Sequence, residues 1–321
     1  MTDRRSIAIL LFVTAVLFAD VLFLGRGFYK GDLFVYHFPM KKVVRDLVFA
    51  EGLPHWNPAY HAGQPLAANP AYELFYPPQW LVLLPSYPWA FQLHIVVHFA
   101  LAAIGMYLLL RSLELRAGAA ILGAIAFAFG APYLSLLTRL PFLFAMTWMP
   151  WVLLFARRAS ITKAPRDIAL GALVFGMQAL LGEPVTTFQT AALAGGYALY
   201  RRAVPRVAVM LAGGLLIAAV QLVPAIDHAR DSVRSEGFTW ANASNWSTPP
   251  ARLAELAYPR IFRAFTSRDG SEAIRQMYAL RAQPYIAEIY LGLLIAIPAL
   301  AGFLRGGRGR WPTLGILAVS I

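Results

Sequence analysis

Long apolar stretches separated by short, arginine-rich turns run through this 321-residue sequence. A helix needs about 20 apolar residues to cross the hydrocarbon core of a bilayer. The stretches that we expect to form membrane helices are 7–25, 89–110, 118–137, 142–155, 168–181, 185–200, 207–223 and 285–304. Several are short, so we expect some to tilt or to cross only partly.

The charged residues are distributed unevenly between the two sets of turns. Under this assignment the short segments on one side hold 14 of the 28 Lys and Arg residues but three of the 16 Asp and Glu residues. The positive-inside rule places these segments, with the N-terminus, in the cytoplasm. The net charge of +12 therefore follows from membrane topology and does not indicate nucleic-acid binding.

The fold class follows from these two patterns. Charged residues make up 14% of the chain, against about 25% in soluble domains. We predict an all-α, polytopic membrane protein in which residues 1–321 form a single transmembrane domain. A further apolar run begins near residue 311, so we expect this chain to be the N-terminal part of a longer protein. Cysteine is absent, which excludes disulfides and thiolate chemistry.

Two long segments, 31–78 and 225–284, lie on the outer side under this assignment. In the first, Met40, Val43, Val44, Leu47 and Val48 follow the spacing of an amphipathic helix lying in the membrane interface. Its opposite face is expected to carry Lys41, Lys42, Arg45 and Asp46. Pro39 suits the first turn of this helix, and Glu51-Gly52 marks its end.

Asp32 is the first candidate for chemistry. It follows the first expected membrane helix by about seven residues and lies among Phe34, Tyr36, His37 and Phe38. A carboxylate in such surroundings can act as a general base. Asp and related residues also cap helices, and the sequence is compatible with both roles.

Other polar residues in apolar surroundings give further candidates. Glu183 lies in a turn between two expected membrane helices and could contact substrate, or cap or anchor a helix. His94 and His98 have metal-ligand spacing, but without an H-E-x-x-H pattern we interpret them as hydrogen-bonded residues of the bundle. His37, His55 and His61 could bind phosphate, sugar or a divalent ion such as Mg or Mn.

The second long segment opens with a charged helix. Arg230 and Arg234 are four residues apart, as are Asp227 and Asp231. Two arginines on one stripe at headgroup depth suit a phosphate group. Internal ion pairs on a solvated helix are the alternative explanation.

Several motifs, taken in order, resemble the YfhO family of bacterial integral membrane proteins. They are G-D-L-F-V-Y-H-F-P (31–39), L-P-H-W-N-P-A-Y-H-A-G-Q-P-L (53–66), F-Y-P-P (75–78), L-G-E-P (181–184), Q-L-V-P-A-I-D-H-A-R-D-S-V-R (221–234) and W-S-T-P-P-A-R-L-A-E-L-A-Y-P (246–259). Each motif is loose, and their order is the stronger signal. Glu183 departs from the family pattern, which commonly has a histidine in that turn.

The resemblance implies a GT-C-like glycosyltransferase of the bacterial cytoplasmic membrane. Such enzymes move a sugar from a polyprenyl-phosphate carrier to an envelope polymer or lipid acceptor on the outer face. Asp32 matches the acidic residue of the first outer loop that serves as base or orients the acceptor. Arg230 and Arg234 would then bind the departing phosphate. The residues expected to line the sugar or acceptor pocket are Tyr36, His37, Trp56, Asn57, His61 and Glu183.

Two other functions remain open from the sequence. A transporter or flippase for a lipid-linked or anionic substrate would explain Asp20, the His94/His98 pair and the basic outer segments. It predicts charged residues along a path through the whole bundle, and internal repeats, of which the sequence has no convincing example. A non-catalytic assembly subunit is the third possibility. An outward cavity that holds Asp32 with Arg230 and Arg234 would favour the transferase.

Overall fold

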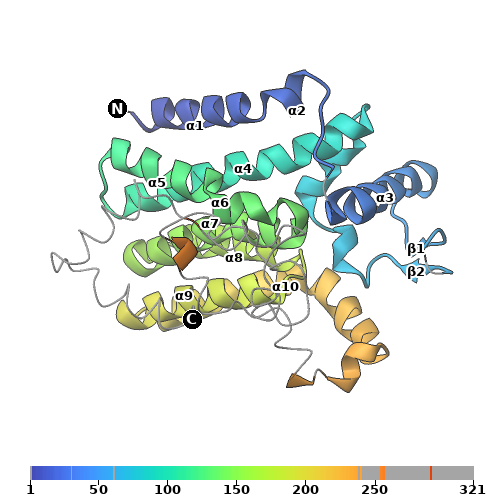
Figure 1. Cartoon of the computed structure of the whole chain (residues 1–321). Coiled ribbons are helices and arrows are strands. Elements are labelled where there is room, and N and C mark those ends of the chain that lie inside the picture. The colour runs from blue at the N-terminus through green and yellow to red at the C-terminus, as the bar shows by residue number, and fades with distance from the viewer. Residues whose placement is uncertain are drawn as a thin grey trace. The chain divides into compact units, whose positions relative to one another are not determined.

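The computed structural model describes residues 2–29, 31–60, 62–237, 239–240, 254–256 and 290 (Figure 1). The chain divides into two compact units, of which the first comprises Met1–Phe129 with Leu136–Phe238 and the second Gly130–Ser135 with Thr239–Ile321. The expected membrane helix at 285–304 and most of the expected outer segment 225–284 lie outside the described residues.

The described part of the chain is predominantly helical. In the first unit the α-helices are α1 (Asp3–Leu17), α2 (Ala19–Phe23), α3 (Phe38–Glu51), α4 (Tyr87–Ser112), α5 (Ala117–Phe129), α7 (Leu140–Thr162), α8 (Pro165–Ala179), α9 (Pro184–Tyr200) and α10 (Val204–Arg230). Strands β1 (Trp56–Asn57) and β2 (Gln64–Pro65) pair antiparallel, with Trp56 opposite Pro65. Short 3₁₀ helices cover Pro70–Tyr72 and Pro77–Leu83. Helix α6 (Ala131–Leu134) belongs to the second unit.

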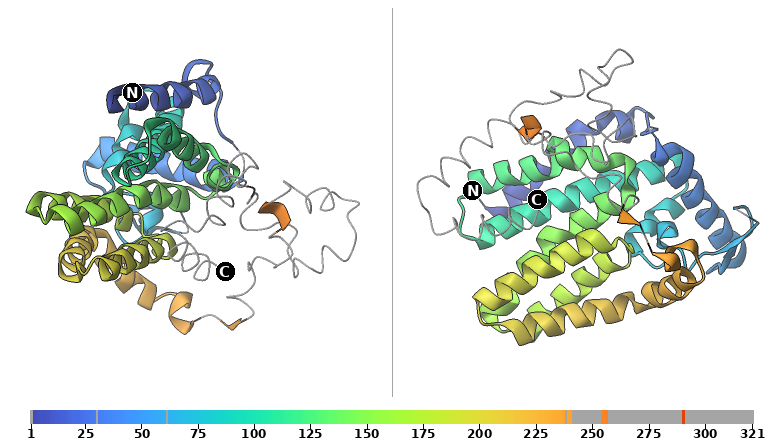
Figure 2. Two further views of the ribbon diagram at one scale, coloured as in Figure 1. Left: turned by 90° about the vertical axis from the view of Figure 1, so that its left-hand side faces the viewer. Right: turned by 60° about the horizontal axis from the view of Figure 1, so that its bottom comes forward.

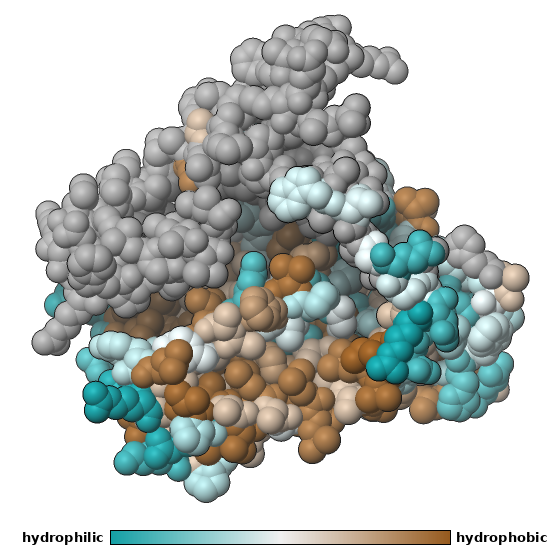
Figure 3. Space-filling view, turned by 90° about the horizontal axis from the view of Figure 1, so that it is seen from below, coloured by the Kyte–Doolittle hydropathy of each residue, from teal (hydrophilic) through white to brown (hydrophobic). Residues whose placement is uncertain are grey.

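Four of the described helical segments are long and apolar enough to cross a membrane. They are Tyr87–Ser112, Ala117–Thr138, Leu140–Thr162 and Val204–Arg230. Their surfaces carry the large apolar side chains that lipid requires: on α10, for example, Val209, Leu216 and Val223 are exposed. Figure 3 shows apolar residues forming a broad band between hydrophilic ends on the face seen from below. The protein is therefore a helical membrane protein.

Some helix boundaries differ from the sequence prediction for local reasons. The expected helix 118–137 is interrupted at Gly130, which caps α6, and Pro132 lies in the first turn of α6. Proline lacks the amide hydrogen that a continuous helix would use there. The first expected membrane helix, 7–25, begins earlier than predicted, at Asp3, and is interrupted at Phe18. Helix α7 continues well past residue 155, to Thr162.

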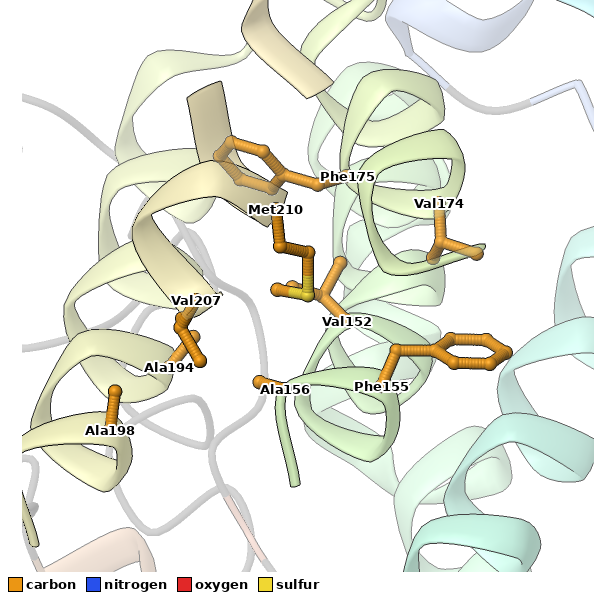
Figure 4. Close-up of a cluster of buried hydrophobic side chains, with 9 residues drawn as sticks. All are labelled: Val152, Phe155, Ala156, Val174, Phe175, Ala194, Ala198, Val207 and Met210. Carbon is orange, nitrogen blue, oxygen red and sulfur yellow. The ribbon is translucent and has the colours of Figure 1, made fainter. Parts of the chain in front are cut away.

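Small residues allow α8 and α10 to pack closely against each other in the first unit. A Cβ atom added at Gly214 would lie 2.9 Å from the carbonyl oxygen of Ala172 and 2.9 Å from the amide nitrogen of Gly176. Around this contact, buried side chains from α7, α8, α9 and α10 form an apolar core (Figure 4). Met210 of α10 lies within this core. Close backbone approach at small residues is typical of helix association in membranes.

The segment 31–86 lies at one end of the helices, called here the loop end (Figures 1 and 2). Contacts from distant turns confirm this position. The backbone at Gly182, between α8 and α9, packs against Pro70, where an added Cβ would lie 2.3 Å from the Cβ of Pro70. The Gln221 side chain of α10 donates to the carbonyl of Ala67 at 2.6 Å. At the opposite end, Asp3 accepts a hydrogen bond from Tyr107 at 2.7 Å.

Helix α3 has the predicted boundaries, but its environment differs from the prediction. Gly52 ends the helix with φ +80°, a conformation that glycine adopts without a steric cost. Its apolar side packs within the segment itself, where Met40 and Val44 contact Leu66, Tyr72 and Leu74. The apolar stripe therefore forms a small core at the loop end, and much of it is not available to lie in lipid.

Candidate functional site

Asp32 lies at the loop end in an exposed ion pair. Its Oδ2 is 3.1 Å from a terminal guanidinium nitrogen of Arg139, and the two side chains are 57% and 28% exposed. Gly31, at φ +59°, turns the chain just before it, and a π-helical turn, Leu33–His37, follows. Arg139 directly precedes α7. Asp32 therefore presents an exposed carboxylate to solvent, and the Arg139 cation lies directly beside it.

His37, which the sequence predicts in the sugar or acceptor pocket, is buried beside this pair. Burial lowers the pKa of His37 to about 3, and the positive charges of Lys41 and Arg139 add to the effect. Its Nδ1 has no hydrogen-bond partner among the described residues. The ring of Tyr36 packs edge-on against it, with 5.1 Å between ring centroids. His37 is thus a neutral ring at neutral pH, in the interior of the loop end.

Lys41 and Glu73 form a buried ion pair that the sequence analysis did not anticipate. Lys41 Nζ is 2.8 Å from Glu73 Oε1, and the two side chains are 0% and 1% exposed. The same ammonium group donates to the carbonyl of Ala71 at 2.8 Å. The prediction that Lys41 lies on the solvent side of its helix is therefore wrong. Because a lone buried charge is costly, the lysine is retained there by its carboxylate partner.

Burial moves the pKa values of this pair in opposite directions. Loss of water lowers the pKa of Lys41, and the nearby Glu73 charge partly opposes the change. Loss of water raises the pKa of Glu73, with Lys41 opposing it. Both shifts favour the neutral forms, so the difference in proton affinity between the two groups is smaller than in water.

Two histidines of α4 extend the polar cluster toward α7. His94 Nε2 is 3.9 Å from the second carboxylate oxygen of Glu73. Nδ1 of His98 is 2.7 Å from the carbonyl oxygen of His94, so this nitrogen carries the hydrogen. The Tyr76 hydroxyl donates to Nε2 of His98 at 2.6 Å and accepts from the Trp148 indole at 2.7 Å. These contacts confirm the interpretation of His98 as a hydrogen-bonded bundle residue, whereas Nε2 of the His94 ring has no hydrogen-bond partner among the described residues.

Two features of this cluster are unusual for a purely structural ion pair. Glu73 has a left-handed backbone, with φ 56° and ψ 33°, which costs about 1–3 kcal/mol for a residue other than glycine. Glu73 Oε2 and His94 Nε2 face each other without a hydrogen-bond partner in the part of the chain that the structure describes. Strained backbone and orphaned polar atoms are common at functional sites. We name Lys41, Glu73, Tyr76, His94, His98 and Trp148 the buried cluster.

Trp56 and Asn57 hold the hairpin of β1 and β2 together. The Asn57 side chain is buried, donates to the Tyr72 hydroxyl at 2.6 Å and accepts from the amide of Ala59 at 2.9 Å. The Trp56 ring lies against Gly63, where an added Cβ would be 2.5 Å from it. The exposed face of Trp56 remains free to stack on a sugar, whereas Asn57 is fully engaged in the hairpin.

The other expected site residues lie elsewhere. Glu183 caps α9, and its two carboxylate oxygens accept from the amides of Val185 and Thr186 at 3.0 and 2.6 Å. Capping explains its burial without a substrate contact. Arg230 is exposed at the end of α10. His61 and the side chain of Arg234 lie outside the described residues.

The cation that the structure places beside Asp32 is Arg139, and sequence reasoning gave it no role. No sequence signal identifies this partner, because the two residues are 107 positions apart. Within the described ranges, no group of three or more His, Asp or Glu side chains is arranged to hold a metal ion.

No protein-family description matches the chain, and neither the curated proteins nor the solved structures contain a significant match.

Proposed function

We propose that the protein is a membrane glycosyltransferase with a GT-C-like arrangement. It takes a sugar from a polyprenyl-phosphate carrier and transfers it to an envelope polymer or lipid acceptor. The loop end would face the outside of a bacterial cytoplasmic membrane. The observation that carries the proposal is the exposed Asp32–Arg139 pair at the end of a membrane bundle. The order of the YfhO-like motifs supports the same reaction class.

The pair supplies the two charges that such a reaction needs. Asp32 accepts the proton of the acceptor hydroxyl while the hydroxyl oxygen forms a bond to the anomeric carbon of the sugar. The bond between that carbon and the carrier phosphate breaks, and the phosphate leaves with the bonding electrons. The Arg139 guanidinium, which suits phosphate geometry, neutralises the departing charge. Arg139 thus takes the role that the sequence suggested for Arg230 and Arg234.

Substitution of Asp32 tests the proposal in cells that lack the chromosomal copy. Cells carrying Asp32→Asn should accumulate polyprenyl-phosphate sugar and lose the product glycan. Loss of a general base lowers a rate by about 10²–10⁴-fold. Mass analysis of envelope glycans and lipid-linked sugars measures both quantities. Asp46→Asn is the matched control, because Asp46 is an exposed carboxylate paired with Lys42 at 2.6 Å.

The control and the variant must reach the membrane in equal amounts. Asp46→Asn should restore the glycan to the wild-type level. If Asp32→Asn restores it equally well, Asp32 is not the base and the proposed mechanism is wrong.

Transport of a lipid-linked or anionic substrate is the second candidate, and the buried cluster is the observation that favours it. Beyond His98, the described buried residues of α4 include Phe99, Ala102 and Ala103, none of which carries a charge. The charged pair of the cluster, Lys41 and Glu73, belongs to the loop end, an arrangement that agrees better with chemistry at one surface. Reconstituted vesicles distinguish the two, since a transporter would move labelled substrate across the bilayer without changing it.

A further inference from the structure

An apolar pocket lies between α3 and the 3₁₀ helix Pro77–Leu83, away from Asp32. It has a volume of about 280 Å³ and is lined by Val44, Val48, Gly52, Leu53, Leu74, Gln79, Trp80, Val82 and Leu83. Small-molecule sites typically start near 300 Å³, so the pocket has room for a chain segment but not for a whole lipid. Leu53 and Trp80 are exposed and therefore mark its mouth.

Gln79 is the feature that distinguishes this pocket from a packing defect. Its side chain is 1% exposed, and neither amide atom has a hydrogen-bond partner among the described residues. An unpaired buried amide costs about 1–3 kcal/mol. In a 3₁₀ helix, residues three apart lie on the same side, so Gln79 and Val82 face the pocket together. The orphaned amide therefore points to a ligand that both accepts and donates a hydrogen bond.

The position of the pocket indicates where the ligand comes from. The 3₁₀ helix leads into α4, a membrane helix that begins at Tyr87. Arg45 of α3 holds the end of this 3₁₀ helix in place by donating to the carbonyls of Val82, Leu84 and Pro85. The mouth with its exposed Trp80 is thus close to the membrane surface, where Trp side chains are enriched. Apolar chains from the bilayer can reach it directly.

We propose that this pocket binds the end of an alkyl chain from the membrane that carries a hydroxyl or amide group. The chain packs against the valines and leucines of the pocket. Its polar group donates to Oε1 and accepts from Nε2 of Gln79. A plain hydrocarbon or an ether leaves at least one of these amide atoms unpaired, so the site selects for groups that do both.

Photolabelling of the full chain in lipid nanodiscs tests the proposal. The probes are decan-1-ol, decanamide and decyl methyl ether, each with a diazirine in the chain, and the labelled residues are located by mass spectrometry. The alcohol and the amide should label α3 and residues 77–83 with about five- to tenfold higher apparent affinity than the ether. That ratio corresponds to the net value of a buried hydrogen bond.

Two variants separate the polar contact from the packing. Gln79→Leu should remove the preference for alcohol and amide, while labelling by the ether stays within about twofold of wild type. Val48→Phe fills the pocket and should reduce labelling by all three probes.

Comparison of the three probes on the wild-type protein needs no variant, so the test does not depend on the folding of Gln79→Leu. Equal labelling by alcohol and ether, or labelling that avoids α3 and residues 77–83, would overturn the proposal. Labelling that is unchanged in Val48→Phe would overturn it as well.

Discussion

Lys41 and Glu73 place opposite charges where water reaches neither side chain. Such a pair is weak evidence for stability, because the cost of desolvation can exceed the attraction between the charges. Here the pKa of Glu73 is raised and that of Lys41 lowered, with burial as the main cause of each. The protein thus keeps a pair that an apolar core would not need.

A double-mutant cycle measures how strongly the two charges depend on each other. Lys41→Met or Glu73→Leu alone should lower the free energy of unfolding by about 3–5 kcal/mol, because each leaves a buried charge without its partner. The double variant should lose less than either single variant. Unfolding in mixed micelles measures all four proteins. The exposed Lys42–Asp46 pair is the control and should contribute at most about 1 kcal/mol. Additive losses at Lys41 and Glu73 would show that the charges act independently.

The sequence contained part of the information about this cluster. Lys41, Val44 and Val48 are spaced as i, i+3 and i+7, which places the lysine at the edge of the apolar stripe of α3. Glu73 is a single acidic residue among apolar and aromatic neighbours. Neither signal identifies the other residue, because the pairing depends on how α3 folds back on residues 70–76. For the same reason Asp32 was a candidate from its position, whereas its partner Arg139 could not be predicted.

At the scale of elements, local signals predicted the helices well and their contacts poorly. The end of α3 at Gly52 and the start of α9 after Glu183 follow from capping chemistry. The close contact of α8 with α10 depends instead on Gly214 meeting the backbone of α8. Considered by itself, a glycine within a helix predicts lower helix stability. It becomes a packing residue only when a second helix lies against it.

Alanine substitution at two glycines distinguishes these roles. Gly214→Ala should destabilise the protein by about 1–3 kcal/mol, because the new Cβ meets backbone atoms that cannot rotate away. Gly196→Ala on α9 is the matched control, since its Cβ would have no neighbour within 4 Å. It should be neutral or stabilise the helix by up to about 1 kcal/mol. Thermal unfolding in one detergent measures both. Equal effects of the two substitutions would contradict the close packing of α8 and α10.

At the scale of the whole chain, the charge pattern predicts that successive turns lie alternately at the two ends of the bundle. The contacts at the two ends of the first unit agree with this prediction. Arg139, Gly182 and Gln221 reach the segment 31–86, whereas Arg111 and Arg157 lie near the C-terminal ends of α4 and α7, at the opposite end. There Arg111 Nε is 3.1 Å from Asp3, and Arg157 Nε donates to the carbonyl of Ser112 at 2.9 Å. The sequence predicted which turns share an end because charge follows topology. It did not predict the side-chain contacts, which depend on helix packing.

The absence of cysteine from these 321 residues makes the orientation of the two ends directly measurable. Glu51 is exposed at the end of α3, and Gly118 is exposed at the start of α5, where an added Cβ would have no neighbour within 4 Å. Each is replaced by cysteine in turn. Neither substitution alters a Lys or Arg residue, so the positive-inside signal is preserved. In intact cells with a permeable outer layer, a membrane-impermeant maleimide should label Glu51→Cys but not Gly118→Cys. After the membrane is opened with detergent, both should react to the same extent. Labelling of Gly118→Cys alone in intact cells would place the loop end in the cytoplasm, where it could not modify an envelope polymer, and would exclude the proposed transferase.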